Sequence, residues 1–411
     1  MSSAGLSKSR LERMHHVLSG YVERKEMPGL VALVSHHDDV HVETLGNLSF
    51  DSRSFDAESL GRSAPMQRDT IFRIASLSKP ITAVAAMILV EECRLRLDES
   101  IEPWLPELAN RRVLKSIASQ LDDTVPALRA ITVRDLLTFR MGLGSVMARP
   151  DTYPIQKLIR EYRIGGDGPP RPTQAPGTEE WLAKLGSLPW IAQPGEKWLY
   201  HVSSDVLGVL IARVSGQSLG TFLRERIFDP LGMKDTAFYV PAEKIDRLPA
   251  CYRFNRKTNR LDLYDDPANS DWRMEPPFES GGGGLVSTVD DHFAFSRMML
   301  NKGRHGREQI LSRAAVELMT SDQLTPEQRA GSEIFFGNHR SWGFGMAVEI
   351  ERNDIFRTPG RFGWDGGFGT SAYTDPAESM IGILLTQRMM ESPEPPQVFS
   401  DFWTLAYGTM E

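Results

Sequence analysis

The apolar residues of this chain follow two different spacings, and these separate the ends of the sequence from its middle. Within residues 1–25 the apolar positions lie three and four apart, as on one face of a helix: Leu11, Met14, Val17, Leu18 and Val22. Two β-rich runs follow, Gly29–Ser35 and Val40–Leu45, with only residues 36–39 between them. The pattern predicts an amphipathic helix and then a β-hairpin.

The apolar run Ser76–Leu97 predicts a buried helix, and from about Asp98 to Ser280 the pattern is mainly helical and broken by loops. Four prolines within Gly165–Gly177 argue against regular structure there and predict a surface loop. Strand-like runs then return before a last helix around Val398–Tyr407; these runs are Phe344–Ile350, Gly367–Thr374 and Met380–Thr386.

Strands at both ends with helices between them predict an α+β fold, in which N- and C-terminal strands share one antiparallel sheet flanked by helices. Residues 1–97 and 281–411 would form the sheet domain, and residues 98–280 an inserted, mainly helical domain. With 411 residues, 41% of them apolar, the chain is long enough to bury a full core.

Charge and composition exclude several classes of function. The formal net charge of −7 comes from dispersed acidic residues without a long basic stripe, so nucleic acid is not an expected partner. No segment offers about 18 uncharged apolar residues, and the N-terminal residues lack the apolar core of a signal peptide. We therefore expect a cytoplasmic protein with no membrane partner. Cys93 and Cys251 are too few for a disulfide framework and are expected to be free thiols.

The residues between the first two strands are of types that bind metals: His36, His37, Asp38, Asp39 and His41. A polar hairpin turn explains them without a metal. We expect neither a metal nor a cofactor.

The motif Ser76-Leu77-Ser78-Lys79-Pro80 opens the buried helix. Residues three apart on a helix share a face, so the Lys79 amine can reach the Ser76 hydroxyl. Desolvation lowers the pKa of a buried lysine, which can then take the proton that a serine nucleophile must lose. Chance supplies roughly one Ser-x-x-Lys in a chain this long. A capped helix start is the alternative interpretation of this motif.

Two further segments complete a possible site. Tyr200 follows a Pro-Gly loop and precedes an apolar helix. Lys79 could draw its phenol toward the phenolate, which would relay protons; a core tyrosine is the alternative. Trp364-Asp365-Gly366-Gly367 precedes a predicted strand, where the Gly367 N–H together with the Ser76 N–H would form an oxyanion hole. A β-bulge or hairpin corner would also explain these glycines.

The order Ser-x-x-Lys, Pro-Gly-x-x-x-x-Tyr, Trp-x-Gly-Gly resembles the serine β-lactamase and penicillin-binding-protein superfamily. Within it, the chain is most similar to the branch of class C β-lactamases and family VIII carboxylesterases. The resemblance covers about residues 25 to 390 and includes three supporting segments: Leu136-Leu137-Thr138 with Gly142-Leu143, Pro230–Thr236, and Gly283–Thr288. It implies Ser76 as nucleophile, with Lys79 and Tyr200 as its proton-handling partners and the active site between the two domains.

The chain departs from class C β-lactamases at two motifs. Their Tyr-x-Asn and Lys-Thr-Gly stand here as Tyr200-His201-Val202 and Trp364-Asp365-Gly366. A substrate carboxylate would lose a cation at Trp364 and meet the anion Asp365, unless Arg357 or Arg361 restores the charge. Trp364 is similar to the esterase branch and suits an apolar acyl or alcohol group.

One other serine motif is present. Gly216-Gln217-Ser218-Leu219-Gly220 matches the Gly-x-Ser-x-Gly of α/β-hydrolases, which needs a strand before the serine. A helical pattern, Val206–Val214, precedes it here, so the glycines indicate a helix C-cap and turn. His201 follows Tyr200 and can shape the pocket, but no Ser-His-Asp arrangement is indicated.

The resemblance thus implies a serine carboxylesterase acting on small-molecule esters with short acyl chains. The alternatives are a β-lactamase or D-amino-acid peptidase or amidase, an acyltransferase using the same site, and a non-catalytic binding member. The oligomeric state stays open.

Overall fold

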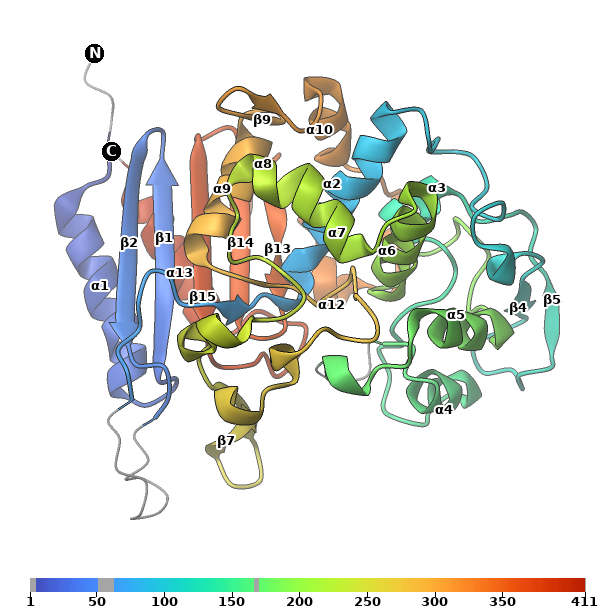
Figure 1. Cartoon of the computed structure of the whole chain (residues 1–411), viewed down its shortest axis with the longest axis horizontal. Coiled ribbons are helices and arrows are strands. Elements are labelled where there is room, and N and C mark those ends of the chain that lie inside the picture. Colours follow the sequence, from blue (N-terminus) through green and yellow to red (C-terminus); the bar gives the residue numbers. More distant parts are fainter. Residues whose placement is uncertain (1–4, 51–62, 166–169, 411) are drawn as a thin grey trace.

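The computed structural model describes residues 5–50, 63–165 and 170–410, and a seven-stranded antiparallel sheet forms its centre (Figure 1). The strands lie side by side in the order β11 (Arg340–Trp342), β12 (Ala347–Glu349), β13 (Phe362–Gly366), β14 (Thr370–Asp375), β15 (Met380–Thr386), β1 (Gly29–His36) and β2 (Asp39–Gly46). Leu33 of β1 lies opposite Ile383 of β15. The two ends of the sequence therefore share one sheet, which confirms the predicted α+β fold.

Helices cover both faces of this sheet (Figure 1). On one face lie α1 (Lys8–Glu23) and α13 (Gln397–Gly408), and on the other lie α2 (Ser78–Glu91) and α9 (Val289–Leu300). Two neighbouring residues of β14 show that different helices cover the two faces, because successive side chains of a strand point to opposite faces. Ser371 accepts a hydrogen bond from Trp403 of α13, whereas Ala372 lies beside His292 of α9.

Further helices extend beyond α2, away from the sheet edge formed by β2 (Figure 1). They and the helices near α9 are α3 (Val133–Leu137), α4 (Pro154–Glu161), α5 (Thr178–Ser187), α6 (Val202–Ser215), α7 (Leu219–Leu223), α8 (Asp229–Leu231), α10 (Arg313–Met319), α11 (Pro326–Arg329) and α12 (Glu333–Phe336). Short strand pairs accompany them: β3 (Phe72–Arg73) with β8 (Val286–Ser287), β4 (Arg112–Leu114) with β5 (Thr124–Pro126), β6 (Cys251–Asn255) with β7 (Arg260–Asp265), and β9 (Arg304–His305) with β10 (Glu308–Gln309).

The buried helix is shorter than its apolar run predicts. α2 begins at Ser78, and Ser76 lies just before it in a 3₁₀ turn, Ala75–Leu77. Every residue from Ser78 to Leu89 is buried, which is why the run is apolar. The helix ends at Glu91, because the chain turns left-handed at Cys93 (φ +59°).

The strand predictions near the C-terminal end need three corrections. Only Ala347–Glu349 of the predicted strand 344–350 is extended, since a turn with Gly345 at φ +73° precedes it. The run predicted as Gly367–Thr374 begins as a strand at Thr370, and Gly367 lies in the turn that joins β13 to β14. The patterns gave no indication of β11 or β13, nor of the β6–β7 hairpin within the predicted helical region.

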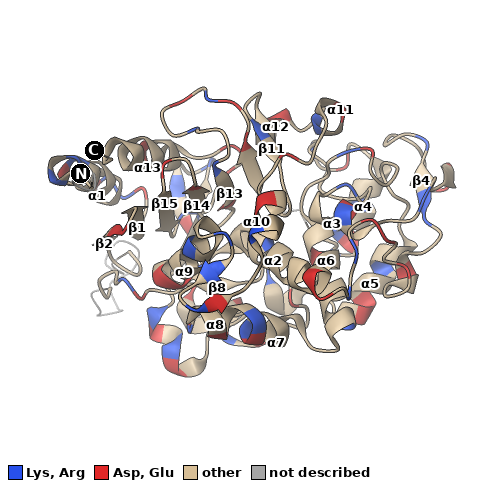
Figure 2. Ribbon diagram, turned by 90° about the horizontal axis from the view of Figure 1, so that it is seen from above, with Lys and Arg blue, Asp and Glu red and all other residues tan. Residues whose placement is uncertain are grey.

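Residues 166–169 of the predicted loop lie outside the described residues, and Pro172–Gln174 forms a short 3₁₀ turn. The β1–β2 hairpin turns at residues 37–38, as predicted. Cys93 is exposed, Cys251 is buried, and both are free thiols. Figure 2 shows Lys and Arg interspersed with Asp and Glu over the helices on this side.

Within the described part of the chain, no single helix is long and apolar enough to cross a membrane. Taken together, α6 and the helical segment Leu219–Leu231 are long and apolar enough, by length and composition only, and the two are bent by 79° relative to each other.

Candidate active site

A tightly held turn places Ser76 at the start of α2. Ala75 has φ +45°, a conformation uncommon for residues other than glycine. The Ser78 hydroxyl bridges the turn, donating to the Ala75 carbonyl at 2.7 Å and accepting from the Leu285 N–H at 3.2 Å. The second serine of the motif therefore fixes the backbone that carries the first.

The three residues predicted to handle the acyl transfer do meet. The Ser76 hydroxyl oxygen lies 2.8 Å from the Lys79 amine and 2.8 Å from the Tyr200 hydroxyl. Trp364 donates its indole N–H to the same Tyr200 oxygen at 2.7 Å. Lys79 of α2 and Tyr200 of the loop before α6 thus both contact the Ser76 hydroxyl, and Trp364 of β13 holds the Tyr200 hydroxyl in turn.

The Lys79 side chain is completely buried. Desolvation lowers its pKa to about 7, although the negative charge of Asp205 acts in the opposite direction. Its amine also donates to the Gly282 carbonyl and lies 3.2 Å from His201 Nδ1. Near neutral pH a large share of Lys79 is therefore the free amine, which is the form that can accept the Ser76 proton.

The pKa of Tyr200 is shifted in the opposite direction, upward. Burial raises its pKa to about 12, and the hydrogen bonds with Ser76 and Trp364 offset only part of this. The sequence suggested that Lys79 draws Tyr200 toward the phenolate. The structure corrects this, since a phenol with this pKa stays protonated and acts as a hydrogen-bond donor.

His201 and Asp205 also belong to this group of contacts, although sequence reasoning gave His201 only a shaping role. His201 Nε2 lies 3.2 Å from Asp205 Oδ2, so the imidazole stands between Lys79 and the carboxylate. Burial alone would raise the pKa of Asp205, but His201, Ser280 and the Gly282 N–H together hold it below its usual value. The spacing i, i+4 at the start of α6 was the available signal.

The β13–β14 turn lies against the residues that precede Ser76. A Cβ at Gly366 would lie 2.5 Å from the Ile74 carbonyl oxygen, so only glycine fits there. The Thr370 hydroxyl donates to the same carbonyl at 3.1 Å. Gly367 is exposed, and its missing side chain leaves open space. The turn therefore packs against Ile74, two residues before the nucleophile, with open space beside the Gly367 Cα.

Asp365 does not face Ser76, contrary to the prediction. Ser371 and Tyr373 both donate hydrogen bonds to its carboxylate, at 2.6 and 3.1 Å. These two residues point to the α13 face of the sheet, opposite to the face of Trp364, as strand alternation requires. The carboxylate is thus a structural acceptor behind the sheet.

The two arginines considered as replacement cations are also engaged elsewhere. Arg361 is buried, with its guanidinium 3.9 Å from the centre of the Tyr373 ring and 4.1 Å from that of Trp403. Arg357 lies over Phe356 and 3.1 Å from His339. Neither is placed to receive a substrate carboxylate at Ser76.

Aromatic rings form a continuous wall beside Tyr200. The Phe335 ring lies 4.9 Å from that of Tyr200, and the Trp342 ring lies 4.8 Å from that of Trp364 at 90°. We call this group the aromatic wall; its members are Phe139, Trp198, Tyr200, Phe335, Phe336, Trp342 and Trp364. Val202, the first residue of α6, is buried in the main core and offers no polar group. The side of the site next to Tyr200 is therefore apolar and densely packed.

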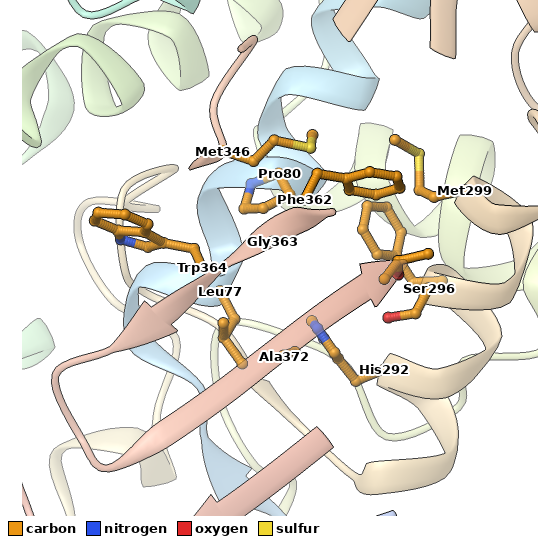
Figure 3. A pocket seen from close by; sticks show the side chains of 12 residues that line it. Leu77, Pro80, His292, Ser296, Met299, Met346, Phe362, Gly363, Trp364 and Ala372 are labelled. Carbon is orange, nitrogen blue, oxygen red and sulfur yellow. The ribbon is translucent and has the colours of Figure 1, made fainter. Parts of the chain in front are cut away.

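A small hollow lies on the other side of Trp364, between α9 and strands β13 and β14 (Figure 3). Figure 3 shows the Trp364 ring turned away from His292 and Ser296. The hollow holds about 20 Å³, room for one water molecule. Burial lowers the pKa of His292 to about 4, so this histidine is neutral. The hollow is separate from the contacts around Ser76.

The other serine motif has a structural role. Gly216 ends α6 in the left-handed conformation (φ +75°), and Ser218 caps α7 by accepting from the Thr221 N–H. This confirms the C-cap and turn predicted there. Among residues 5–50, 63–165 and 170–410, no group of three or more His, Cys, Asp or Glu is arranged to hold a metal ion.

Residues 14–398 match the family model described as Beta-lactamase. The chain belongs to this family. Protein Rv1367c of Mycobacterium tuberculosis is 38% identical over 79% of each chain. Esterase EstB of Burkholderia gladioli is 28% identical over 93% of this chain and 92% of its own. The solved structure of EstCE1, described as a hydrolase with promiscuous acyltransferase activity, has a TM-score of 0.77 at 24% identity and covers 98% of this chain and 99% of its own.

Proposed function

We propose that this member of the beta-lactamase family is a serine carboxylesterase that cleaves small or short-chain acyl esters through an acyl-enzyme on Ser76. One observation carries the proposal: both Lys79 and Tyr200 contact the Ser76 hydroxyl at 2.8 Å. The Lys79 pKa of about 7 supplies a base at neutral pH. The name of Esterase EstB supports the same reaction class.

Acylation begins when Ser76 Oγ forms a bond to the ester carbonyl carbon while its proton passes to the neutral Lys79 amine. The carbonyl oxygen becomes an oxyanion, held by the backbone N–H groups of Ser76 and Gly367. As the bond to the alcohol oxygen breaks, Tyr200 supplies a proton to that oxygen, and the proton on Lys79 restores the phenol. The alcohol leaves and the acyl group stays on Ser76.

Deacylation repeats these steps with water. The water oxygen bonds to the acyl carbon while its proton passes to the neutral Lys79 amine, and the bond to Ser76 Oγ then breaks as Lys79 returns that proton to the serine oxygen. The acid leaves and the enzyme returns to its starting state.

The substrate class follows from the walls of the site. Trp364 stands where class C β-lactamases carry the lysine of Lys-Thr-Gly, and Asp365, Arg357 and Arg361 all face away from Ser76. A neutral ester meets no unfavourable charge here, whereas a β-lactam carboxylate finds no cation in these positions. The aromatic wall packs against Tyr200, so the side of the site next to this residue offers apolar rings to a small neutral ester.

A panel of p-nitrophenyl esters from acetate to decanoate, with nitrocefin beside it, tests this proposal. We expect the highest kcat/KM for acetate or butyrate and none measurable with a folded Ser76→Ala variant. A larger kcat/KM for nitrocefin would instead assign a β-lactamase, and normal turnover by Ser76→Ala would remove Ser76 as the nucleophile.

Acyl transfer to an alcohol is the second candidate, and the description of EstCE1 favours its inclusion. An apolar wall excludes water and retains organic acceptors, so an alcohol can take the place of the deacylating water. Adding short alcohols to the assay and measuring transesterified product against free acid separates the two reactions.

A further inference from the structure

His201 occupies an unusual backbone position. Its dihedral angles, φ +82° and ψ −65°, are those of a strained γ-turn, which the hydrogen bond from the Val202 N–H to the Tyr200 carbonyl closes at 3.2 Å. A non-glycine residue keeps such a conformation only when its surroundings determine it, and such positions cluster at functional sites. The turn directs the imidazole inward to Lys79.

Glycines make room for this imidazole. A Cβ at Gly165 or at Gly282 would lie 3.2 Å from atoms of the His201 ring. The Gly282 backbone serves twice, because its carbonyl accepts from Lys79 while its N–H donates to Asp205 at 2.9 Å. The ring, the amine and the carboxylate are thus held in one packed arrangement.

The hydrogen bonds available to the Lys79 amine indicate the role of the His201 imidazole. A neutral amine has two N–H donors and one lone pair, and three atoms surround it: the Gly282 carbonyl oxygen, His201 Nδ1 and Ser76 Oγ. The carbonyl can only accept. If His201 Nδ1 also accepts, both N–H groups are used and the lone pair is left facing Ser76.

Asp205 sets the tautomer that this requires. Its carboxylate accepts from the Ser280 hydroxyl at 2.6 Å and from the Gly282 N–H, so it is fixed and ionised beside His201 Nε2. An N–H at Nε2 bonds to that carboxylate and leaves Nδ1 as the acceptor. When Lys79 then takes the Ser76 proton, the ammonium finds three acceptors already in place.

We infer that His201, held by Asp205, is a positioning residue that directs the lone pair of Lys79 at the Ser76 hydroxyl. This inference rests on the proposed function, since it concerns proton removal from the same nucleophile. Among the described residues, the titratable or charged groups that contact His201 are Lys79 on α2, Asp205 on α6 and the adjoining Tyr200.

Two variants separate the acceptor from the bulk of the ring. His201→Phe keeps a ring but has no nitrogen, whereas His201→Asn keeps an acceptor near the place of Nδ1 and cannot titrate. At pH 8 we expect His201→Phe to lower kcat for p-nitrophenyl acetate roughly 10- to 100-fold and to change KM by less than about 2-fold. The reason is that the substitution misdirects the Lys79 amine and leaves substrate binding unchanged. His201→Asn should recover kcat to within about 5-fold of the wild type.

The pH profile adds a reading that a purely structural role would not move. The fall of kcat below neutrality should follow the protonation of Lys79 in the wild type and in His201→Asn alike, whereas His201→Phe removes one of the three acceptors of the Lys79 ammonium and should move the midpoint of the profile to lower pH. Thermal unfolding confirms that each variant is folded; if His201→Phe does not fold, His201→Ala replaces it. His36→Asn, at a buried histidine at the end of β1, is the matched control and should keep kcat within about 2-fold.

The rate at which an alkyl fluorophosphonate labels Ser76 keeps this inference separate from the esterase proposal. Slower labelling of His201→Phe, with labelling restored in His201→Asn, supports the positioning role even if no ester is turned over. Equal kcat and equal labelling rates in His201→Phe and the wild type would overturn the positioning role. A folded His201→Asn variant that reacts as slowly as His201→Phe would overturn it too. Neither outcome depends on which esters the wild type cleaves.

Discussion

Two buried cations lie on opposite faces of the same sheet, and their surroundings differ in one respect. Lys79, on the α2 face, contacts no carboxylate of the described residues directly, because His201 stands between it and Asp205. Arg340, on the α13 face, bonds directly to Glu349 at 2.7 Å. Burial acts to lower the pKa of both, but Tyr373, Glu349 and Asp365 raise that of Arg340 well above its usual value, whereas that of Lys79 falls to about 7.

The difference shows how one fold keeps one cation charged and allows the other to lose its proton. A directly paired guanidinium neutralises its carboxylate and joins β11 to β12. An amine whose carboxylate is one ring away remains titratable near neutral pH, as a base must. The following four changes, from the largest expected effect to the smallest, test this contrast.

Replacing Lys79 should separate activity from stability. Lys79→Met removes the base, and we expect kcat to fall by about 10³- to 10⁴-fold. The unfolding free energy at pH 7 should rise by about 1–3 kcal/mol, because a lysine with a lowered pKa makes the folded state bind fewer protons than the unfolded state between pH 7 and 10.5. Ester kinetics and urea unfolding measure both. A variant less stable than the wild type would contradict this account of Lys79.

Replacing Arg340 should give the opposite result. Arg340→Met leaves the buried Glu349 with only the longer hydrogen bond from Arg361 at 3.5 Å, and we expect a loss of about 3 kcal/mol in urea unfolding at pH 7. The double variant with Glu349→Leu should recover part of that loss. The fraction that remains folded should keep its kcat. Equal stability of Arg340→Met and the wild type would remove the contrast between the faces.

The pH dependence of kcat/KM should follow Lys79 in the free enzyme. With a pKa of about 7, roughly a tenth of Lys79 is neutral at pH 6 and nine tenths at pH 8. We expect kcat/KM to rise by about tenfold per unit below pH 6, to rise more slowly as the pH approaches 7, and to level off between pH 8 and 10, where Tyr200 still keeps its proton. A flat profile down to pH 5 would show that no group of this pKa acts as the base.

Trp364 should contribute the smallest effect. Trp364→Phe keeps an aromatic ring in the wall but removes the N–H that donates to Tyr200 at 2.7 Å. We expect kcat to fall by about 3- to 10-fold, in line with one hydrogen bond of roughly 1 kcal/mol. Steady-state kinetics with p-nitrophenyl butyrate, and Trp342→Phe as a control in the same wall, measure this. A loss of 100-fold would assign Trp364 a direct role.

Much of this site was predictable because its signals are local or shared by a family. Ser76 and Lys79 are three residues apart at the start of a helix, so their contact follows from helical geometry. The apolar runs of β1, β2 and β15 likewise predicted the sheet. The order of the motifs assigned Tyr200 to the site, and in the structure its hydroxyl contacts Ser76 Oγ. The proposed two-domain division stays a prediction.

The features that were missed depend on tertiary context. A left-handed turn at His201 has no marker in the sequence, because the residue is neither Gly nor Asn. Asp365 was assigned to the wrong face, since the strand was predicted to begin at Gly367 and the alternation along β13 was not visible. No signal in the sequence marks Arg340 and Glu349 as buried; in the fold they pack against Tyr373 and Arg361.

The aromatic wall gives the protein an optical signature. The Trp342 and Trp364 rings lie 4.8 Å apart at 90°, close enough for their transitions to couple, and Trp364 bonds to the tyrosine that touches the nucleophile. Near-ultraviolet circular dichroism senses such fixed aromatic packing. An acyl group on Ser76 that displaces Tyr200 would change this spectrum, so the occupancy of the site can be followed without a chromogenic substrate or a label.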